Sequence, residues 1–410
     1  MRFPIFRRLL PVLLLAAAAF TLQAQDAPDS LAVAESPQAP ERTPRFQAGG
    51  YIKNLQALLF FNPGIGEASF LQDNFFHHRL NLSYEAHPRW RLHAGLRTRL
   101  FFGDVVRANP GYAAQIDGGA NDWLDLSAVW LDRSGWVGHS VLDRAYAEYT
   151  HQRWEVRLGR QRVNWGISSI WNPNDIFNAF AFTDFDYEER PGSDALRVRY
   201  FTGFAGSVEL AVRGARDPEN ITAAGRWVFN RKGYDWQLIG GYARRDWVLG
   251  GGWAGNLGNA GFKGEWTYFY HLPNDNTPRH NLSATLGIDY VFSNSLYLNG
   301  GMLYNSNGSS SAGILNLFNF QLSARNLYPY RWSALIQAGY PLTPLLNTGL
   351  ALIYSPASTH PVFANPTLSI SIADNWNLDA VGQIVMEKRP NNDGYGSPLQ
   401  AVFLRLKLSY

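Results

Sequence analysis

The chain reads WEVRLGRQRVNWG at residues 154–166 and ALRVRY at residues 195–200, and residues 167–194 join the two segments. In the second segment, apolar residues alternate with Arg197 and Arg199. Alternation with a period of two predicts a β-strand that has one apolar face and one polar face. In a soluble β-sandwich, the apolar face would pack against a second sheet.

The same alternation recurs from about residue 46 to the last of the 410 residues, with no helical pattern that could cover the apolar faces. It predicts an all-β fold, namely a transmembrane antiparallel up-and-down β-barrel. The expected number of strands is about 18, within a range of roughly 16–20. Fourteen Trp, 20 Tyr and 25 Phe exceed what a soluble core needs and suit the aromatic girdles of such a barrel.

The links between the predicted strands differ in length in a regular way. Links after even-numbered strands are short: 87–89, 151–153, 231–233, 293–294 and 342–343. Links after odd-numbered strands are mostly long: 62–74, 103–140, 166–193, 306–330 and 387–397, with a tight link near Arg245 as the exception. Bacterial outer-membrane barrels have long loops on the outer rim and short periplasmic turns, so this sorting favours a barrel over a sandwich. Residues 122–141 leave room for an extra hairpin.

Three segments divide the chain. Residues 1–24 carry three arginines followed by an apolar run, which is typical of a secretory signal peptide. Residues 25–45, rich in Pro, Ala and acidic residues, are expected to be a disordered periplasmic leader, and residues 46–410 form the barrel. Without the signal peptide, the chain has 33 basic and 33 acidic residues, so nucleic acid is not expected as a partner.

The C-terminal strand alternates in the same way and ends on Tyr410. Outer-membrane barrels resemble this pattern, because their last strand ends on an aromatic residue that their assembly machinery reads. The resemblance implies the bacterial outer membrane as the location, with its lipid and the barrel-assembly machinery as partners.

An arginine ladder is predicted on the inner wall of the second to the seventh strand. If the apolar phase faces lipid, these side chains face the lumen: Arg79, Arg97, Arg99, Arg144, Arg157, Arg197, Arg199 and Arg213. Inner acids on the same strands are Glu85, Glu148, Glu155 and Glu209, while the later strands contribute mainly Ser, Thr, Asn and Gln. Guanidinium groups bind carboxylate and phosphate oxygens, so the ladder predicts anion preference. The alternative is that the arginines pair with the glutamates and brace the wall.

The alternation breaks at Gly159, because the phase of the preceding residues would place Arg160 and Arg162 in lipid. A bulge at Gly159 would return Arg162 to the lumen and direct Val163 and Trp165 outward. The alternative is that the strand ends above the lipid.

The link 166–193 is the candidate constriction. Asn172 and Asp175 predict a helix start, with Pro173 at the first helical position and the helix running to Phe180. Such a helix needs an apolar partner, so we expect the link to fold into the barrel mouth. Four acids later in the link would then face the basic wall: Asp184, Asp186, Glu188 and Glu189. Packing on the rim outside the channel is the alternative.

Signals of catalysis are weak in this sequence. There is no cysteine, the nine histidines are scattered, and no HExxH, GxSxG or phosphate-loop motif occurs. We therefore expect no catalytic residue, no metal and no cofactor.

The segments LGRQRVNWG, WNPND and PGSDALRVRY within residues 154–200 resemble the strand–loop–strand of alginate-export-type and related porin-like outer-membrane proteins. That resemblance implies an 18-stranded barrel with a basic lumen that passes anionic saccharides. The resulting hypothesis is a channel for passive diffusion of small hydrophilic, preferentially anionic solutes, narrowed by residues 166–193. An export port for an anionic polysaccharide, a rim-sited hydrolase and a non-conducting structural barrel remain alternatives.

Overall fold

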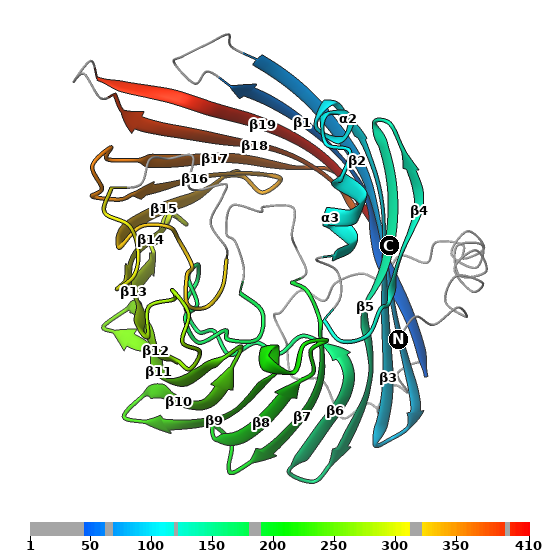
Figure 1. Ribbon diagram of the computed structural model, residues 1–410, viewed down its shortest axis with the longest axis vertical. Coiled ribbons are helices and arrows are strands. Elements are labelled where there is room, and N and C mark those ends of the chain that lie inside the picture. Colours follow the sequence, from blue (N-terminus) through cyan, green and yellow to red (C-terminus); the bar gives the residue numbers. More distant parts are fainter. Residues whose placement is uncertain (1–44, 62–68, 119–121, 180–189, 312–321, 390–393) are drawn as a thin grey trace.

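A computed structural model describes residues 45–61, 69–118, 122–179, 190–311, 322–389 and 394–410. Antiparallel strands form one sheet that curls into a barrel (Figure 1). Their bounds are Phe46–Phe61 (β1), Ser69–His87 (β2), Trp90–Gly103 (β3), Ser127–Arg133 (β4), Trp136–His151 (β5), Trp154–Gln161 (β6), Ser193–Phe201 (β7), Ser207–Arg213 (β8), Thr222–Arg231 (β9), Tyr234–Ala243 (β10), Asp246–Leu257 (β11), Ala260–His271 (β12), His280–Val291 (β13), Tyr297–Asn305 (β14), Trp332–Thr343 (β15), Leu346–Tyr354 (β16), Val362–Ala373 (β17), Trp376–Lys388 (β18) and Tyr395–Ser409 (β19).

The barrel is closed by its first and last strands. β1 pairs with β19 from Tyr51 opposite Ser409 to Phe61 opposite Leu399. Among the 19 described strands, β4 pairs only with β5, and β3 pairs directly with β5, so 18 strands complete the ring. The predicted closed antiparallel barrel of about 18 strands is confirmed.

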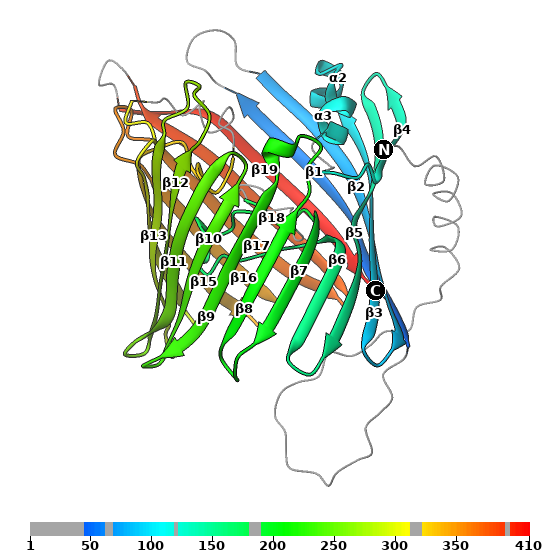
Figure 2. The ribbon, with the colours of Figure 1, turned by 60° about the horizontal axis from the view of Figure 1, so that its bottom comes forward.

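β4 and the first half of β5 form the extra hairpin for which residues 122–141 left room. β5 begins at Trp136, and its first half lies between β3 and β4, whereas its second half lies between β3 and β6. Figure 2 shows β4 rising beside β5 at the rim with the long loops. Two short helices, Asp104–Ala108 (α2) and Tyr112–Gly118 (α3), precede β4 and were not anticipated from the sequence.

Side chains alternate between the two faces as expected. On β8, Val208, Leu210 and Val212 are exposed on the outer face, while Glu209 and Arg213 are buried on the inner face. The exposed residues of neighbouring strands are likewise apolar, which suits contact with lipid chains. The described residues include no helix with the length and apolar character required to cross a bilayer.

Link lengths follow the predicted order. Two-residue turns join β2 to β3, β5 to β6 and β9 to β10, all at one rim (Figure 2). At the other rim lie the long connections, among them 162–192 and 306–331. The tight link near Arg245 is also present, since β10 ends at Ala243 and β11 begins at Asp246. The sorting of loops by rim is confirmed.

Two long connections fold into the barrel and build its interior (Figure 1). Residues 162–179, called here the inner loop, pack Val163, Trp165 and Phe177 against inner-face residues of β7–β12. Residues 322–331 cover an apolar inner face on β14–β19, and Trp171 of the inner loop joins this second cluster. The barrel is therefore lined by loops along part of its wall.

Candidate functional site

The inner face of β5–β9 carries a connected network of arginines and carboxylates. Glu209 on β8 is its centre, with 1% of its side chain exposed. Its oxygens accept hydrogen bonds from Arg199 at 2.6 Å, from Arg226 at 3.1 Å and from the Trp165 indole N–H at 2.6 Å. The pairing compensates for the burial of this charge, because a lone buried carboxylate would be strongly destabilising.

The network continues towards β5. Arg157 lies 2.6 Å from Glu148 and 3.2 Å from Glu155, and Arg197 donates to Glu155. Together with Arg199 and Arg226, four guanidinium groups thus surround the carboxylates of Glu148, Glu155 and Glu209. The wall is braced by ion pairs, as the alternative interpretation of the ladder anticipated, yet this cluster keeps one more cation than anions.

The ladder residues on β2, β3 and β5 also lie on the inner wall. Arg79 is buried and lies 2.5 Å from Asp143, while Arg99 contacts His139 at 3.3 Å. Arg97 is buried, and Arg144 donates to the backbone carbonyl of Arg190 at 2.6 Å. Asp143, which sequence reasoning missed, sits at a register shift in the β3–β5 ladder.

Arg213 on β8 connects the wall to the inner loop and to the segment that precedes β4. Its guanidinium lies 3.4 Å from Asp122 and donates to the carbonyl of Phe177 at 3.2 Å. Arg244 donates to the same carbonyl at 3.2 Å. The inner loop is therefore held by cations at its C-terminal end.

The predicted bulge at Gly159 is wrong. The β5–β6 and β6–β7 ladders run without a register shift, although Gly159 has a φ of 120° and leaves no room for a side chain beside Ala145. Strand β6 ends at Gln161, and Arg160 is buried in a bidentate pair with Asp194, at 2.8 and 2.9 Å. The strand-end alternative therefore applies.

Residues 122–126 cover this strand end. The backbone N–H groups of Trp123 and Leu124 donate to the Asp194 carboxylate at 3.1 and 2.8 Å, so the pair is satisfied without lipid contact. Val163 and Trp165, expected to face outward, are instead fully buried inside the barrel. Tertiary packing of the loop overrides the strand alternation at these positions.

The predicted helix from Asn172 is also wrong. Residues 162–179 contain no helix, and Asn172 to Asp175 form a turn closed by the Asp175 N–H on the Asn172 carbonyl at 3.1 Å. The side chain of Asn174 bonds instead to the Gly251 carbonyl at 2.9 Å and to Thr267 at 2.7 Å. These wall contacts replace the intrahelical bonds that the capping signal suggested.

Glu265 on β12 anchors the inner loop. Its buried carboxylate accepts hydrogen bonds from the backbone N–H groups of Ile167 and Ser168, and from that of Asn174 at 3.1 Å. The anchor was not predicted, because no local pattern marks a strand glutamate as the acceptor for a loop about 90 residues away in sequence.

Glycines on β11 let the inner loop approach the wall closely. A Cβ at Gly252 would lie 3.0 Å from Ile167 and 3.2 Å from Asn174, and one at Gly250 would lie 2.9 Å from Asn174. The run Gly250 to Gly252 was a visible sequence signal for close backbone approach.

Among the acids of the predicted constriction, Asp175 lies within the described residues. It is buried, and Arg190 lies 3.2 Å from its carboxylate. Burial raises the pKa of Asp175 to about 7, although Arg190 and Arg162 favour the charged form. Arg162 is half-buried in the inner loop. Asp184, Asp186, Glu188 and Glu189 lie outside the described residues.

The inner face of the later strands is less polar than expected. Leu303, Leu335, Ile353, Phe363 and Val385 are buried there beneath residues 322–331. In the half of these strands near the long loops, apolar residues therefore share the inner face with the expected polar ones, such as Asn305 and Ser333. Trp171 and Tyr328 connect the two inward-folded segments, with ring centroids 5.8 Å apart.

Known structures share this architecture. Pseudomonas aeruginosa OccK11 (OpdR) matches with a TM-score of 0.54 and 10% identity, over 89% of this chain and 95% of that chain. The outer membrane protein opdK of the same organism matches with a TM-score of 0.51 and 8% identity, over 89% and 98%. Acinetobacter baumannii OccAB2 matches with a TM-score of 0.52 and 8% identity, over 88% and 98%.

The fold is that of a porin-like outer-membrane β-barrel. At 8–10% identity the likeness concerns the fold. No protein family model and no curated protein matches the chain. Within the described ranges, no three His, Asp or Glu side chains are grouped so that they could hold a metal ion.

Proposed function

We propose that the chain forms a channel in the bacterial outer membrane through which small hydrophilic, preferentially anionic solutes diffuse passively. The observation that carries this proposal is the excess of cations in the arginine network of β5–β9. Arg157 and Arg199 keep 25% and 23% of their side chains exposed, so their charge acts on solutes in the lumen. A lumen lined by such groups favours anions.

We propose further that residues 166–193 form the constriction. The inner loop is anchored by Glu265 and by the carbonyl of Phe177, which supports a fixed narrowing rather than a freely moving loop. The acids of residues 180–189 would then oppose the basic wall, and opposed charges across a narrow passage select solutes by size and sign.

The same proposal places an N-terminal signal peptide on residues 1–24 and a periplasmic leader on residues 25–45. The C-terminal strand would be read by the barrel-assembly machinery. Tyr410 pairs through its backbone with Gly50, at 2.8 and 2.9 Å, and its hydroxyl contacts His78 at 2.7 Å, so the terminal residue takes part in barrel closure. No enzymatic role is proposed.

Liposome swelling tests the proposal with solutes of similar size and different charge. Gluconate should enter faster than glucose, and glucose faster than protonated glucosamine. A refolded chain that shifts on heating in gel electrophoresis, as folded barrels do, but gives no swelling would contradict the channel. Faster entry of glucosamine than of gluconate would contradict the anion preference.

A further inference from the structure

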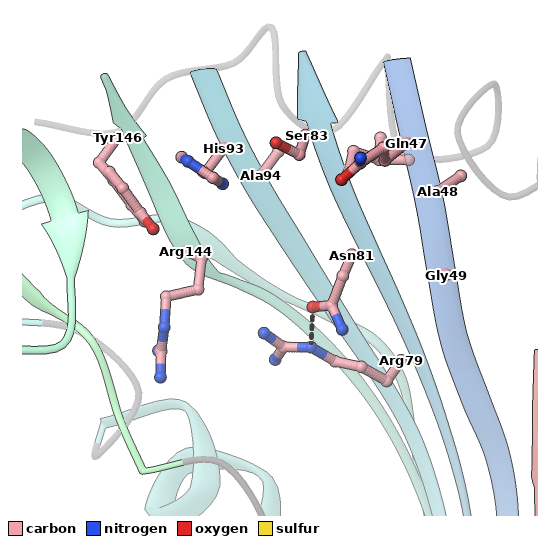
Figure 3. A pocket seen from close by; sticks show the side chains of 11 residues that line it. Gln47, Ala48, Gly49, Arg79, Asn81, Ser83, His93, Ala94, Arg144 and Tyr146 are labelled. Carbon is pink, nitrogen blue, oxygen red and sulfur yellow. Dashed lines mark hydrogen bonds between the residues drawn. The ribbon is translucent and has the colours of Figure 1, made fainter. Parts of the chain in front are cut away.

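A cavity of about 530 Å³ opens on the inner face of β1, β2, β3 and β5, away from the arginine network's centre. Asn81, Ser83, His93, Arg144 and Tyr146 line it (Figure 3). Asn81 and Ser83 lie shortly before the two-residue turn between β2 and β3, and His93 lies shortly after it. The cavity is therefore at the short-turn end of the lumen.

The Asn81 amide has a fixed orientation. Arg79 Nε, which can only donate, lies 2.7 Å from the oxygen of that amide (Figure 3). The Asn81 nitrogen therefore keeps its two N–H groups for other acceptors, and Asn81 is exposed to the cavity. Arg79 itself is held by Asp143 at 2.5 Å.

Gly95 makes this arrangement possible. A Cβ at Gly95 would lie 2.6 Å from Arg79 Nη2 and 3.0 Å from the Arg144 side chain. Arg79 and Arg144 can therefore both lie over β3 at Gly95, where that strand has no side chain.

Two carboxylates near the cavity, Asp143 and Glu148, are engaged by arginines. Asp143 contacts Arg79 and lies 3.7 Å from Arg144, and Glu148 lies 2.6 Å from Arg157. The cavity presents the Asn81 amide donor, the hydroxyl groups of Ser83 and Tyr146, and the positive charge of Arg144. The side chains of Gln47 and His93 complete its polar lining. A set of donors beside a cation matches an oxyanion.

Tyr146 is held rigidly in place. Its ring stacks on His93 with centroids 4.6 Å apart, and the Arg157 guanidinium lies 5.6 Å from its centroid. Because the ring already contacts His93 and Arg157, the hydroxyl at its edge is the group positioned to meet a ligand. The cavity therefore suits an oxyanion better than a stacked sugar ring.

We propose that this cavity binds the oxyanion group of a small solute, either a carboxylate or a phosphate, at the short-turn end of the lumen. The Asn81 amide and the Tyr146 hydroxyl donate hydrogen bonds to it, and Arg144 supplies positive charge. The inference rests on the proposed function in that such solutes reach the cavity through the lumen. It gives the channel a second anion-binding point beyond the constriction.

Isothermal titration calorimetry on the refolded full chain in detergent tests the site with succinate and with inorganic phosphate as separate probes. Saturable binding of succinate alone identifies carboxylate as the ligand group, and binding of phosphate alone identifies phosphate. Asn81→Asp replaces the donor by a second acceptor and adds a negative charge, while Arg79 still stabilises the side chain. Binding should weaken at least about tenfold.

Asn377→Asp is the matched control, because it makes the same change on β18, close to a short turn but outside the cavity. It should leave affinity within about twofold, since exposed charges beyond about 10 Å are largely screened. Tyr146→Phe keeps the ring stacking and removes one donor, so it should weaken binding less than Asn81→Asp.

The site is overturned if the wild-type chain binds neither probe, or if Asn81→Asp and Asn377→Asp weaken binding equally. Conductance is recorded on the same preparations. Binding without conductance would keep the site and contradict the channel, whereas anion-selective conductance without binding would contradict the site alone.

Discussion

The carboxylate of Glu265 on β12 accepts a hydrogen bond from the backbone N–H of Asn174 at 3.1 Å. This contact ties the inner loop, which follows β6, to β12. The two strands are six apart in the order of the chain. Ile167 and Ser168 donate to the same carboxylate, so one buried side chain holds two separate points of the inner loop. The position of the inner loop inside the barrel therefore depends on a residue of the wall.

Glu265→Ala should release the inner loop. Three backbone N–H groups lose their acceptor, and each unsatisfied buried donor costs about 1–3 kcal/mol. Since the chain has no cysteine, a spin label on Ser169→Cys reports loop mobility directly. The label should become mobile in Glu265→Ala and stay immobile in Asp379→Ala, which removes a wall acid on β18 that pairs with Arg405. An unchanged label would show that the anchor is dispensable.

Gly252→Ala should displace the same loop by steric contact. The added Cβ would lie 2.8 Å from the Gly264 carbonyl and 3.0 Å from Ile167. Gly287→Ala on β13 is the control, because its nearest neighbours would be at 3.7 Å. We expect an increased label mobility only in the first variant, and equal spectra for both would refute the close-approach role.

The pH dependence of loop docking follows from Asp175. Burial raises its pKa from the ordinary 3.8 to about 7, while Arg190, Arg162 and Glu265 are the charged groups that face it. Docking favours the protonated acid, so docking should weaken as pH rises from about 4 to about 7 and change little above that. In Asp175→Asn, label mobility should vary less across this range than in the wild-type chain. Tighter docking at high pH would contradict the assignment.

Replacing Arg197 and Arg199 by Ser should shift selectivity towards cations. The variant leaves Glu155 and Glu209 with fewer partners, and removing one partner of a buried pair costs about 3–5 kcal/mol. The unfolding midpoint in urea should therefore fall as well. Arg231→Ser with Lys232→Ser removes the same charge at an exposed turn and should alter neither selectivity nor midpoint.

Tyr410→Ala should reduce the amount of folded barrel recovered from bacterial outer membranes. The substitution removes the hydroxyl contacts to His78 and to the Arg79 carbonyl, at 2.7 and 3.1 Å, together with the terminal aromatic group. Tyr395→Ala, at the other end of β19, is the matched control. Equal recovery of the two variants would argue against a special role for the last residue.

Alternation along the strands predicted that apolar residues and arginines occupy opposite sides of the wall on strands such as β7, because the period of two follows from strand geometry. Leu196 and Arg197, for example, lie on the expected faces, and link lengths located both rims. The inner acids Glu148, Glu155 and Glu209 were also identified, although not which arginine each one binds.

Alternation does not predict what covers an inner face. Leu303 and Phe363 face inward against a loop rather than water, and Trp165 follows the packing of its loop rather than the phase of β6. The local capping signal at Asn172 is outweighed by the contacts of Asn174 with Gly251 and Thr267, which are distant in sequence. Such non-local contacts leave no periodic trace in the sequence.

The most direct test of the central claim is single-channel conductance of the refolded chain in a planar bilayer under a salt gradient. The salt concentration on the more dilute side of the bilayer is kept near 0.1 M. At this concentration the Debye length is about 10 Å, so charges in the lumen still act on passing ions. We predict steady conductance with a reversal potential of anion-selective sign. A folded, heat-modifiable barrel that gives no conductance, or a reversal potential of cation-selective sign, would contradict the account.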